Sequence, residues 1–444
     1  MPALVPETNP PFAGGSRWSA GTESATAQSG SAARPAGTVG PNVLVRRAFD
    51  LSVFAIPFTS LYLPGTGGTV GVLRLVQLVM LGAVLSQPQV CLRWVPTALF
   101  WFLGYITLRI VWGVWLTPEM SGLWWPSSRE FIQFLPWVWV MFNLLQFPGT
   151  WRRGLWAAGA GSFLCALFHI AGIGVAQAAD EIENRTSVFG MHANELGATY
   201  ATAMIALLAL WMARSRTWTQ RFLPFPMAAI IGIAMAKTGS RAALILLAIG
   251  VLVLFFYGDS MGSRIKRFGG LLVFGAVLTV ILWQIPTAMS RFQEINPQNI
   301  GENNPRARML PVLWEMFLRS PLYGLGPDGY ESELTRRAMP YLVNQGRSIV
   351  AHNQVLLLLV ETGIIGFLLF STGLWLALAA AWRARHKPGG PLPLALVLAF
   401  IIVAATVTHP DHFLILWVAV AYGLAGAASS PPGTGISNQE RMPA

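Results

Sequence analysis

Residues 348–370 read SIVAHNQVLLLLVETGIIGFLLF, a run hydrophobic enough for a membrane span that nevertheless holds polar side chains. His352 and Asn353 stand at its start, and Glu361 lies inside it. A carboxylate about two and a half turns into an apolar helix is costly unless an opposite charge or a proton compensates it. Arg74 and Arg109, which also fall in apolar runs, are candidate partners for Glu361 or for a lipid head group.

The composition of the whole chain is that of a membrane protein. Of its 444 residues, 54% are hydrophobic and only 11% are charged, whereas a soluble domain carries about 25% charged residues. Eighteen Trp and 25 Phe suit lipid and interfacial belts. The net charge is +11, but the basic residues lie between the apolar runs and do not form a continuous basic stripe. This distribution argues against nucleic acid as a partner. Cys91 and Cys165 have no metal-binding spacing. The chain is predicted to be an all-α polytopic integral membrane protein.

Apolar runs of roughly 20 residues mark membrane-spanning helices. Twelve spans are predicted, near 48–64, 69–87, 94–116, 130–148, 155–177, 194–213, 222–238, 240–257, 268–286, 353–383, 391–408 and 411–428. The seventh and eighth nearly touch, so one is short or their turn lies within the membrane. The run 353–383 is too long for one straight span, and a bend is expected near Gly363 and Gly366.

The distribution of bases sets the predicted orientation. With a cytoplasmic N-terminus, every inside connection carries bases: Arg46 and Arg47; Arg93; Arg152 and Arg153; Arg214, Arg216 and Arg221; Arg264, Lys266 and Arg267; Arg383, Arg385 and Lys387. The short outside connections hold few. Both termini are therefore predicted to be cytoplasmic, and His352 is predicted to lie at the extracytoplasmic surface.

Five regions follow from this reading of the sequence. Tails at 1–42 and 429–444 have compositions that cannot bury a core and are expected to be disordered in the cytoplasm. Bundles of about nine and about three spans occupy 43–286 and 352–428. Between them, 287–351 forms a large, mostly helical loop on the outer side.

Two outer segments ahead of the large loop carry cations. In NRTSVFGMHANELG (184–197), Arg185 precedes a helix that is expected to start near Asn194; the alternative is a loop with an Asn cap. In AKTGSRAALILL (236–247), Lys237 and Arg241 flank a predicted tight turn. Its backbone N–H groups would be free to form an anion nest, although snorkelling of the two cations to lipid phosphates is the alternative.

The large loop contains NNPRARMLPVLWEMFLRSPLYGLGPDGY, residues 303–330. Arg306 and Arg308 open a predicted helix that ends at Ser320. Four apolar residues of this helix are expected to be buried: Leu310, Leu313, Trp314 and Phe317.

Several arginines and one histidine at a lipid surface indicate a particular chemistry. Arginine binds phosphate oxygens with two parallel hydrogen bonds, and histidine takes up a proton near neutral pH. The combination suggests a site that handles a lipid-linked phosphate or pyrophosphate and activates a hydroxyl. The chain has no HExxH or Walker motif.

At this point four segments resemble a known family. HNQVLLLLVETGIIGFLLF is similar to the signature HN-x-x-L-x(4)-E-x-G-x-x-G of the O-antigen ligase/polymerase superfamily. KTGSRAALI resembles its SRG-like segment, RARMLPVLW…PLYGLGPDGY resembles its loop motif, and NRTSVFGMHANELG resembles its Arg…Gly…Asn segment. They cover roughly residues 184–370 in the expected order, and the ligase branch is the best match.

The resemblance implies a metal-independent glycosyltransferase of the bacterial inner membrane, without cofactors. It would move O-antigen glycan from undecaprenyl pyrophosphate to a sugar hydroxyl of lipid A–core at the periplasmic face, in lipopolysaccharide assembly. His352 would be the general base or orient the hydroxyl. Binding of the pyrophosphate would fall to Arg185, Arg241 and Arg308, with Arg306 and Lys237.

The resemblance also implies supporting roles for Asn353, Glu361 and Asn194. The loop arginine of the family usually lies closer to the tryptophan than Arg308 lies to Trp314, so Arg306 and Arg308 are alternatives for one role. The motifs leave open an O-antigen polymerase and a protein O-oligosaccharyltransferase that acts on Ser or Thr of a pilin. A multi-span transporter or flippase is an alternative from another class, although no internal repeat supports it.

Overall fold

The computed structural model describes residues 40–62, 71–177, 186–212, 217–256, 269, 275–276, 305–336, 343–344, 347–348, 353–387, 390–404 and 414–428. All of them belong to one unit that begins at Gly40. The predicted tails, apart from residues 40–42, lie outside the described residues. Asn42 caps the first helix, since its Oδ1 accepts a hydrogen bond from the Val45 N–H at 2.8 Å.

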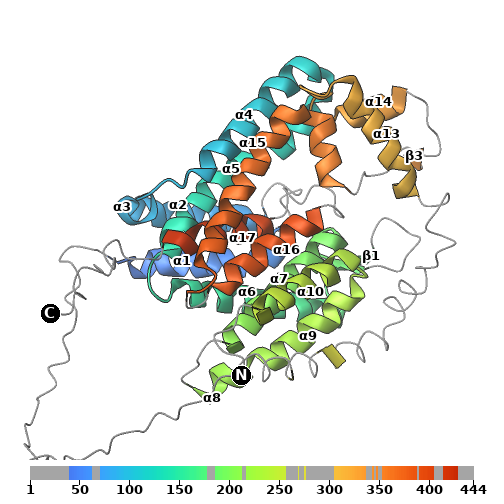
Figure 1. The fold of residues 1–444 in the computed structure, drawn as a ribbon. Coiled ribbons are helices and arrows are strands. Elements are labelled where there is room, and N and C mark those ends of the chain that lie inside the picture. The colour runs from blue at the N-terminus through green and yellow to red at the C-terminus, as the bar shows by residue number, and fades with distance from the viewer. Residues whose placement is uncertain are drawn as a thin grey trace, which may run out of the picture. The chain divides into compact units, whose positions relative to one another are not determined.

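Helices occupy eleven of the twelve predicted spans (Figure 1). They are α1 (Val43–Phe54), α2 (Val72–Ser86), α4 (Ala98–Leu116), α5 (Ser121–Leu145), α6 (Thr150–Ala171), α7 (Ala193–Met212), α9 (Pro224–Lys237), α10 (Arg241–Phe256), α15 (Gln354–Ala384), α16 (Pro391–Ala404) and α17 (Leu414–Ala428). Most of the remaining run, 268–286, lies outside the described residues. Among those described, α4, α6, α7 and α15 are long and apolar enough to cross a membrane. The fold is consistent with an all-α membrane protein, and the count of twelve spans stays a prediction.

Other helical elements lie in the connections between these helices. They are η1 (Ile56–Phe58), α3 (Pro88–Cys91), η2 (Pro118–Met120), α8 (Trp218–Phe222), α13 (Pro305–Arg319) and α14 (Gly329–Arg336). Two small antiparallel hairpins were not predicted: β1 (Val175–Gln177) pairs with β2 (Thr186–Val188), and β3 (Val343–Asn344) pairs with β4 (Arg347–Ser348). Strands of two or three residues are too short to show the alternation that identifies a strand in a sequence.

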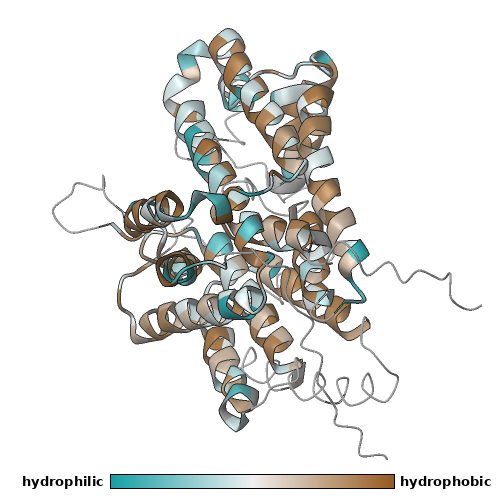
Figure 2. Ribbon diagram, turned by 90° about the vertical axis from the view of Figure 1, so that its left-hand side faces the viewer, coloured by the Kyte–Doolittle hydropathy of each residue, from teal (hydrophilic) through white to brown (hydrophobic). Residues whose placement is uncertain are grey.

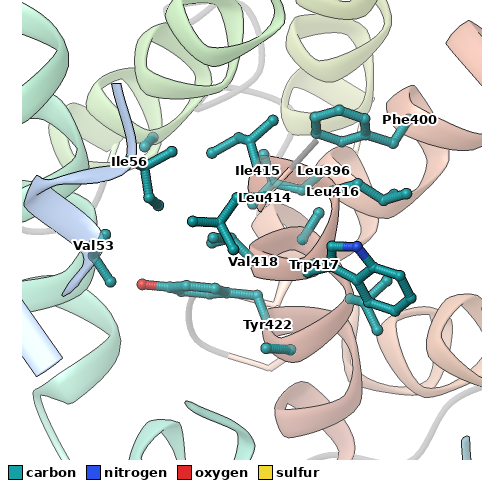
Figure 3. Close-up of a cluster of buried hydrophobic side chains, with 14 of the residues drawn as sticks. Val53, Ile56, Leu396, Phe400, Leu414, Ile415, Leu416, Trp417, Val418 and Tyr422 are labelled. Carbon is teal, nitrogen blue, oxygen red and sulfur yellow. The ribbon is translucent and has the colours of Figure 1, made fainter. Parts of the chain in front are cut away.

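Interlocking aromatic rings form the centre of the helix bundle. Phe102 of α4, Phe370 of α15 and Trp417 of α17 meet edge to face, with ring centroids 5.0 Å apart for Phe102 and Trp417 and 5.7 Å apart for Phe102 and Phe370. Figure 3 shows Trp417 among apolar side chains that include Phe400 of α16. Small residues let the helices approach closely, because a Cβ on Gly373 would lie 2.7 Å from the Phe102 ring. Hydrophobic residues also predominate along the helices in Figure 2.

The buried face of α13 differs from the prediction. Leu313 and Phe317 are buried as expected, but Leu310 and Trp314 are 39% and 49% exposed. The helix instead buries Met309 and Met316 beside the expected pair. The expectation that Leu310 and Trp314 are buried was wrong, because they lie on a row of the helix next to the one that faces the core.

The long helix α15 is broken at Gly363, whose φ of 64° and ψ of −168° are not helical. This confirms the expected bend. Before the break, Leu357 and Val360 join the core formed by α13 and α14. After the break, Phe370 and Ala377 join the core of the bundle. Leu358, which also precedes the break, belongs to the bundle core, so the first half of α15 contacts both cores.

Candidate functional site

The break in α15 is closed by the segment 320–328, which follows α13. A helix interruption leaves backbone N–H and C=O groups without their usual partners. Four hydrogen bonds from the 320–328 segment and α15 supply them: Leu325 N–H to Val360 O at 2.7 Å, Gly326 N–H to Glu361 O at 3.0 Å, Ile364 N–H to Pro321 O at 2.8 Å, and Ile365 N–H to Leu322 O at 3.5 Å. The segment is therefore paired with the helix on both sides of the break.

This pairing requires glycine at two positions. A Cβ on Gly363 would lie 2.2 Å from the Leu322 carbonyl oxygen, and one on Gly324 would lie 2.5 Å from the Glu361 carbonyl carbon. Gly324 also has φ of +75°, in the left-handed region that glycine adopts readily. Two backbones thus approach each other without side chains between them.

Glu361 forms a buried ion pair with Arg109 of α4. Arg109 Nη1 lies 3.0 Å from Glu361 Oε2, and both side chains are 1% exposed. Arg109 Nη2 also lies 3.8 Å from Asp328 Oδ2, and the Asp328 N–H donates to Glu361 Oε1 at 3.1 Å. The expectation that an arginine compensates Glu361 is confirmed. Arg74, the other candidate, is exposed on α2.

The end of α4 completes the contact with the 320–328 segment. The Thr117 hydroxyl donates to the Pro327 carbonyl at 3.1 Å, and the Trp124 indole N–H donates to the Thr117 carbonyl at 2.9 Å. A Cβ on Gly326 would lie 2.8 Å from Thr117 Cγ2. Three distant parts of the sequence, in α4, the 320–328 segment and α15, therefore form one buried junction.

The first half of α15 begins at a defined cap. Asn353 is the N-cap, and its Oδ1 accepts a hydrogen bond from the Leu356 N–H at 3.1 Å. His352, which directly precedes the cap, lies outside the described residues. The first half of α15 thus runs from the Asn353 cap, next to the predicted general base, to the junction at Glu361.

The predicted turn between Lys237 and Arg241 is present, but its backbone is not an anion nest. The Thr238 and Gly239 N–H groups donate to carbonyls at the end of α9, and the Ser240 N–H donates to Thr238 Oγ1 at 3.3 Å. These three donors are used within the turn, so the expectation of free N–H groups was wrong. Lys237 is half-buried and Arg241 is exposed, which leaves their side chains as the cationic feature of the turn.

Two other segments meet this turn. The Thr186 hydroxyl donates to the Lys237 carbonyl at 3.0 Å, and it lies 2.8 Å from Nε2 of the buried His169. A Cβ on Gly197, near the start of α7, would lie 2.8 Å from Ser240 Cβ. The turn is thus held by β2 and the start of α7, which both lie within the predicted Arg…Gly…Asn segment, 184–197. Arg185, which directly precedes Thr186, lies outside the described residues.

Asn194 has a different local role from the one considered. The helix α7 begins at Ala193, and the Asn194 N–H donates to His192 Nδ1 at 3.2 Å. His192 also accepts from the Leu196 N–H through its carbonyl at 2.9 Å. The expected helix start near Asn194 is confirmed, and the cap is His192, so the alternative of an Asn cap does not hold.

The loop arginines lie in the first turn of α13. Arg306 and Arg308 belong to the helix, but their side chains lie outside the described part of the structure. The choice between them stays open. Asp328 was missed by sequence reasoning, since a carboxylate in a Gly-rich turn gives no sign of the arginine that it meets. Arg109 was found only as one of two candidates.

Residues 226–371 match the family model described as O-antigen ligase. This part of the chain is an O-antigen ligase superfamily domain. No curated protein matches the chain. The O-antigen ligase domain contains the Lys237–Arg241 turn, α13, Asn353 and Glu361, whereas Arg109 precedes it in the sequence. The family supports glycosyl transfer of the O-antigen ligase or polymerase type, and together with the apolar helices it indicates a membrane protein.

Proposed function

We propose that the chain is an O-antigen ligase. It transfers O-antigen glycan from undecaprenyl pyrophosphate to a sugar hydroxyl of lipid A–core, at the periplasmic face of the bacterial inner membrane. The observation that carries the proposal is the O-antigen ligase domain, in which the Asn353 cap of helix α15 directly follows His352. In this proposal the chain is multi-pass with both termini in the cytoplasm.

In the proposed reaction, His352 accepts the proton of the acceptor hydroxyl. The acceptor oxygen forms a bond to the anomeric carbon of the glycan, and the bond from that carbon to the pyrophosphate oxygen breaks. The electron pair leaves with undecaprenyl pyrophosphate, whose charge Arg185, Arg241 and Lys237 bind together with Arg306 or Arg308. Pre-positioned cations stabilise charge that develops in a transition state, so these steps need no metal.

Supporting residues act through position. The Asn353 cap and the Arg109–Glu361 ion pair hold the two ends of the first half of α15. Asn194 lies at the start of α7, near the turn that carries Lys237 and Arg241. Rigid placement of reacting groups is itself a large part of catalysis. We infer that these residues fix the site and do not touch the reacting atoms.

The test is transfer by the purified full chain in lipid nanodiscs. The donor is a lipid-linked glycan, offered in separate reactions with lipid A–core, with a second lipid-linked repeat unit, or with a pilin peptide. Product on lipid A–core supports the ligase. A lengthened lipid-linked glycan would instead identify a polymerase, and glycosylated peptide a protein O-oligosaccharyltransferase. Movement of donor across the bilayer without covalent product would identify transport.

Two variants test the site. His352→Ala and Arg241→Ala are expected to abolish transfer while the protein stays folded and inserted. Arg383→Ala is the control. It removes an exposed cation near the end of α15 whose side chain donates a hydrogen bond to the Ala379 carbonyl, and it is expected to retain transfer. Full activity of His352→Ala would refute the assigned base. Addition of a chelator to the parent protein is expected to leave the rate unchanged.

A further inference from the structure

The outward face of α13 carries a row of exposed apolar side chains. Leu310, Trp314 and Leu318, spaced by four residues, are 39%, 49% and 58% exposed. At about 100° per residue they cover roughly 80° of the helix surface. The row lies between the buried face of α13 and a row that contains Glu315 and Arg319. The helix therefore has a buried sector, an exposed apolar sector and a polar sector in order around its axis.

The polar sector is neutralised within the protein. Arg319 pairs with Glu315 and with Glu333 of α14, each at 3.0 Å, and Glu333 also pairs with Arg336 at 2.7 Å. These side chains are largely exposed, apart from Glu333. The arrangement leaves the apolar row as the part of α13 whose exposure to water is unfavourable.

The 320–328 segment also exposes apolar side chains. Leu322 and Tyr323 follow α13 after Ser320 and Pro321 and are 53% and 54% exposed. The Tyr323 ring packs edge to face on Trp112 of α4, with centroids 5.9 Å apart. The Leu322 carbonyl accepts from the Ile365 N–H of α15. The exposed apolar surface of the loop is thus joined to the ends of two candidate membrane spans.

Those span ends also expose large apolar side chains. On α4, Val114 and Trp115 are 61% and 79% exposed, and on α15 Ile364 and Leu368 are 42% and 56% exposed. In a membrane protein such surfaces of α4 and α15 face lipid. Leu322 and Tyr323 thus connect the end of α13 to these parts of α4 and α15.

We propose that α13 is docked on the lipid bilayer, with Leu310, Trp314 and Leu318 inserted into the leaflet that surrounds the adjoining ends of α4 and α15. A helix with an apolar face and a charged face lies at the membrane interface with the apolar face buried by about 5–10 Å. Trp and Tyr favour this depth because their rings are amphipathic. Lipid is the occupant because the exposed Leu322 and Tyr323 connect the end of α13 to the ends of α4 and α15, whose exposed apolar side chains face lipid in a membrane protein.

The docking has a structural consequence. The core of α13 is shared with the first half of α15, and the 320–328 segment is locked into the break of that helix. A helix seated on the bilayer through one face therefore fixes the height of the start of α15 relative to the lipid surface. This inference is independent of the reaction that the chain performs.

The experiment uses the full chain in nanodiscs with a fluorophore sensitive to its environment. The label is placed at Leu318→Cys, with Glu315→Cys on the polar sector as the matched control and Leu368→Cys on α15 as the lipid-facing reference. The parent chain is the blank, because Cys91 and Cys165 are buried and burial raises the pKa of the Cys91 thiol to about 11, which suppresses the reactive thiolate.

The readout is quenching by lipids brominated near the top of their acyl chains, compared with quenching by iodide in water. The label at position 318 is expected to be quenched several-fold more by brominated lipid than the label at 315, and less by iodide. Equal quenching at 315 and 318, or strong iodide quenching at 318, would overturn the proposal. Protection of 318 from both quenchers would also overturn it, since it indicates a protein partner or a second copy. If Leu318→Cys fails to insert, Leu310→Cys tests the same row.

Discussion

Arg109 Nη1 lies 3.0 Å from Glu361 Oε2, although 252 positions separate the two residues in the chain. The pair joins α4 to the last helical residues before the break in α15. Asp328 approaches the same guanidinium and also donates its backbone N–H to Glu361. One arginine thereby holds two acidic residues from a loop and a helix at a single buried point.

Removal of Arg109 is expected to destabilise the protein strongly. Arg109→Met leaves Glu361 buried without its counter-charge, and loss of one partner of a buried pair costs about 3–5 kcal/mol. The measurement is the apparent Tm in detergent. Arg109→Lys keeps the charge without the planar fork and is expected to fall between the parent and Arg109→Met.

A double-mutant cycle separates the pair from general damage. Arg109→Met combined with Glu361→Gln removes both charges, and is expected to destabilise the protein less than the sum of the two single variants. Additive losses would mean that the two residues do not stabilise each other. That result would contradict the ion pair as the basis of the junction.

Alanine at the helix break is expected to open the junction. In Gly363→Ala and Gly324→Ala the new Cβ would collide with the opposing backbone at 2.2 Å and 2.5 Å. The left-handed backbone adds about 1–2 kcal/mol for a residue with a Cβ. Limited proteolysis of the loop is expected to accelerate in both variants. Gly82→Ala in α2 is the control, because its Cβ would meet nothing within 4 Å. Equal protection of all three would refute the tight pairing.

Much of this architecture could be predicted from local sequence. The apolar runs predicted the positions of the helices, because the length and the hydrophobicity of a run identify a membrane-spanning helix. The excessive length of 353–383 and the presence of Gly363 together predicted the break. The partner of Glu361 was narrowed to Arg74 or Arg109 by charge alone. The final choice needed the packing of α4 against α15, which no local pattern contains.

Other features depended on contacts that a sequence does not display. Leu310 is the same residue type as the buried Leu313, and Trp314 is a large aromatic residue like the buried Phe317, so only the position of the neighbouring core tells them apart. The backbone N–H groups of the 238–240 turn were expected to be free to bind an anion, because Gly239 is compatible with many turn conformations. The Thr238 hydroxyl oxygen accepts a hydrogen bond from the Ser240 N–H. Carbonyl groups at the end of α9 accept hydrogen bonds from the other two N–H groups. Asp328 reaches Arg109 only through the folding of the Gly-rich segment.

Loss of the α15 cap is expected to weaken the helix start beside His352. Asn353→Ala removes the acceptor of the Leu356 N–H, at a cost of about 0.5–2 kcal/mol. Under the proposed function, glycan transfer falls with the ordering of the helix start. Asn353→Asp keeps an acceptor at the same place and is expected to retain most of the transfer. Equal transfer by the Ala and Asp variants would show that the cap does not position the base.

The connection from His169 through Thr186 to Lys237 is expected to organise the cationic turn. The single hydroxyl proton of Thr186 goes to the Lys237 carbonyl, so Thr186 accepts from the Nε2–H of His169. Thr186→Val keeps the shape but removes both hydrogen bonds, and leaves buried polar groups unsatisfied at about 1–3 kcal/mol. If Lys237 and Arg241 bind pyrophosphate, the KM for the lipid-linked donor is expected to rise by several-fold in this variant, with a smaller change in kcat.

Thr186→Ser provides the comparison that makes this prediction specific. The serine hydroxyl can donate and accept as threonine does, so both the KM for the donor and the apparent Tm are expected to stay near those of the parent. A rise in KM for Val but not for Ser ties donor binding to the hydroxyl, because the two variants differ in hydrogen bonding at the same place. A lowered Tm with an unchanged KM in Thr186→Val would show that the connection stabilises the fold only, and that the turn beside it does not bind the donor.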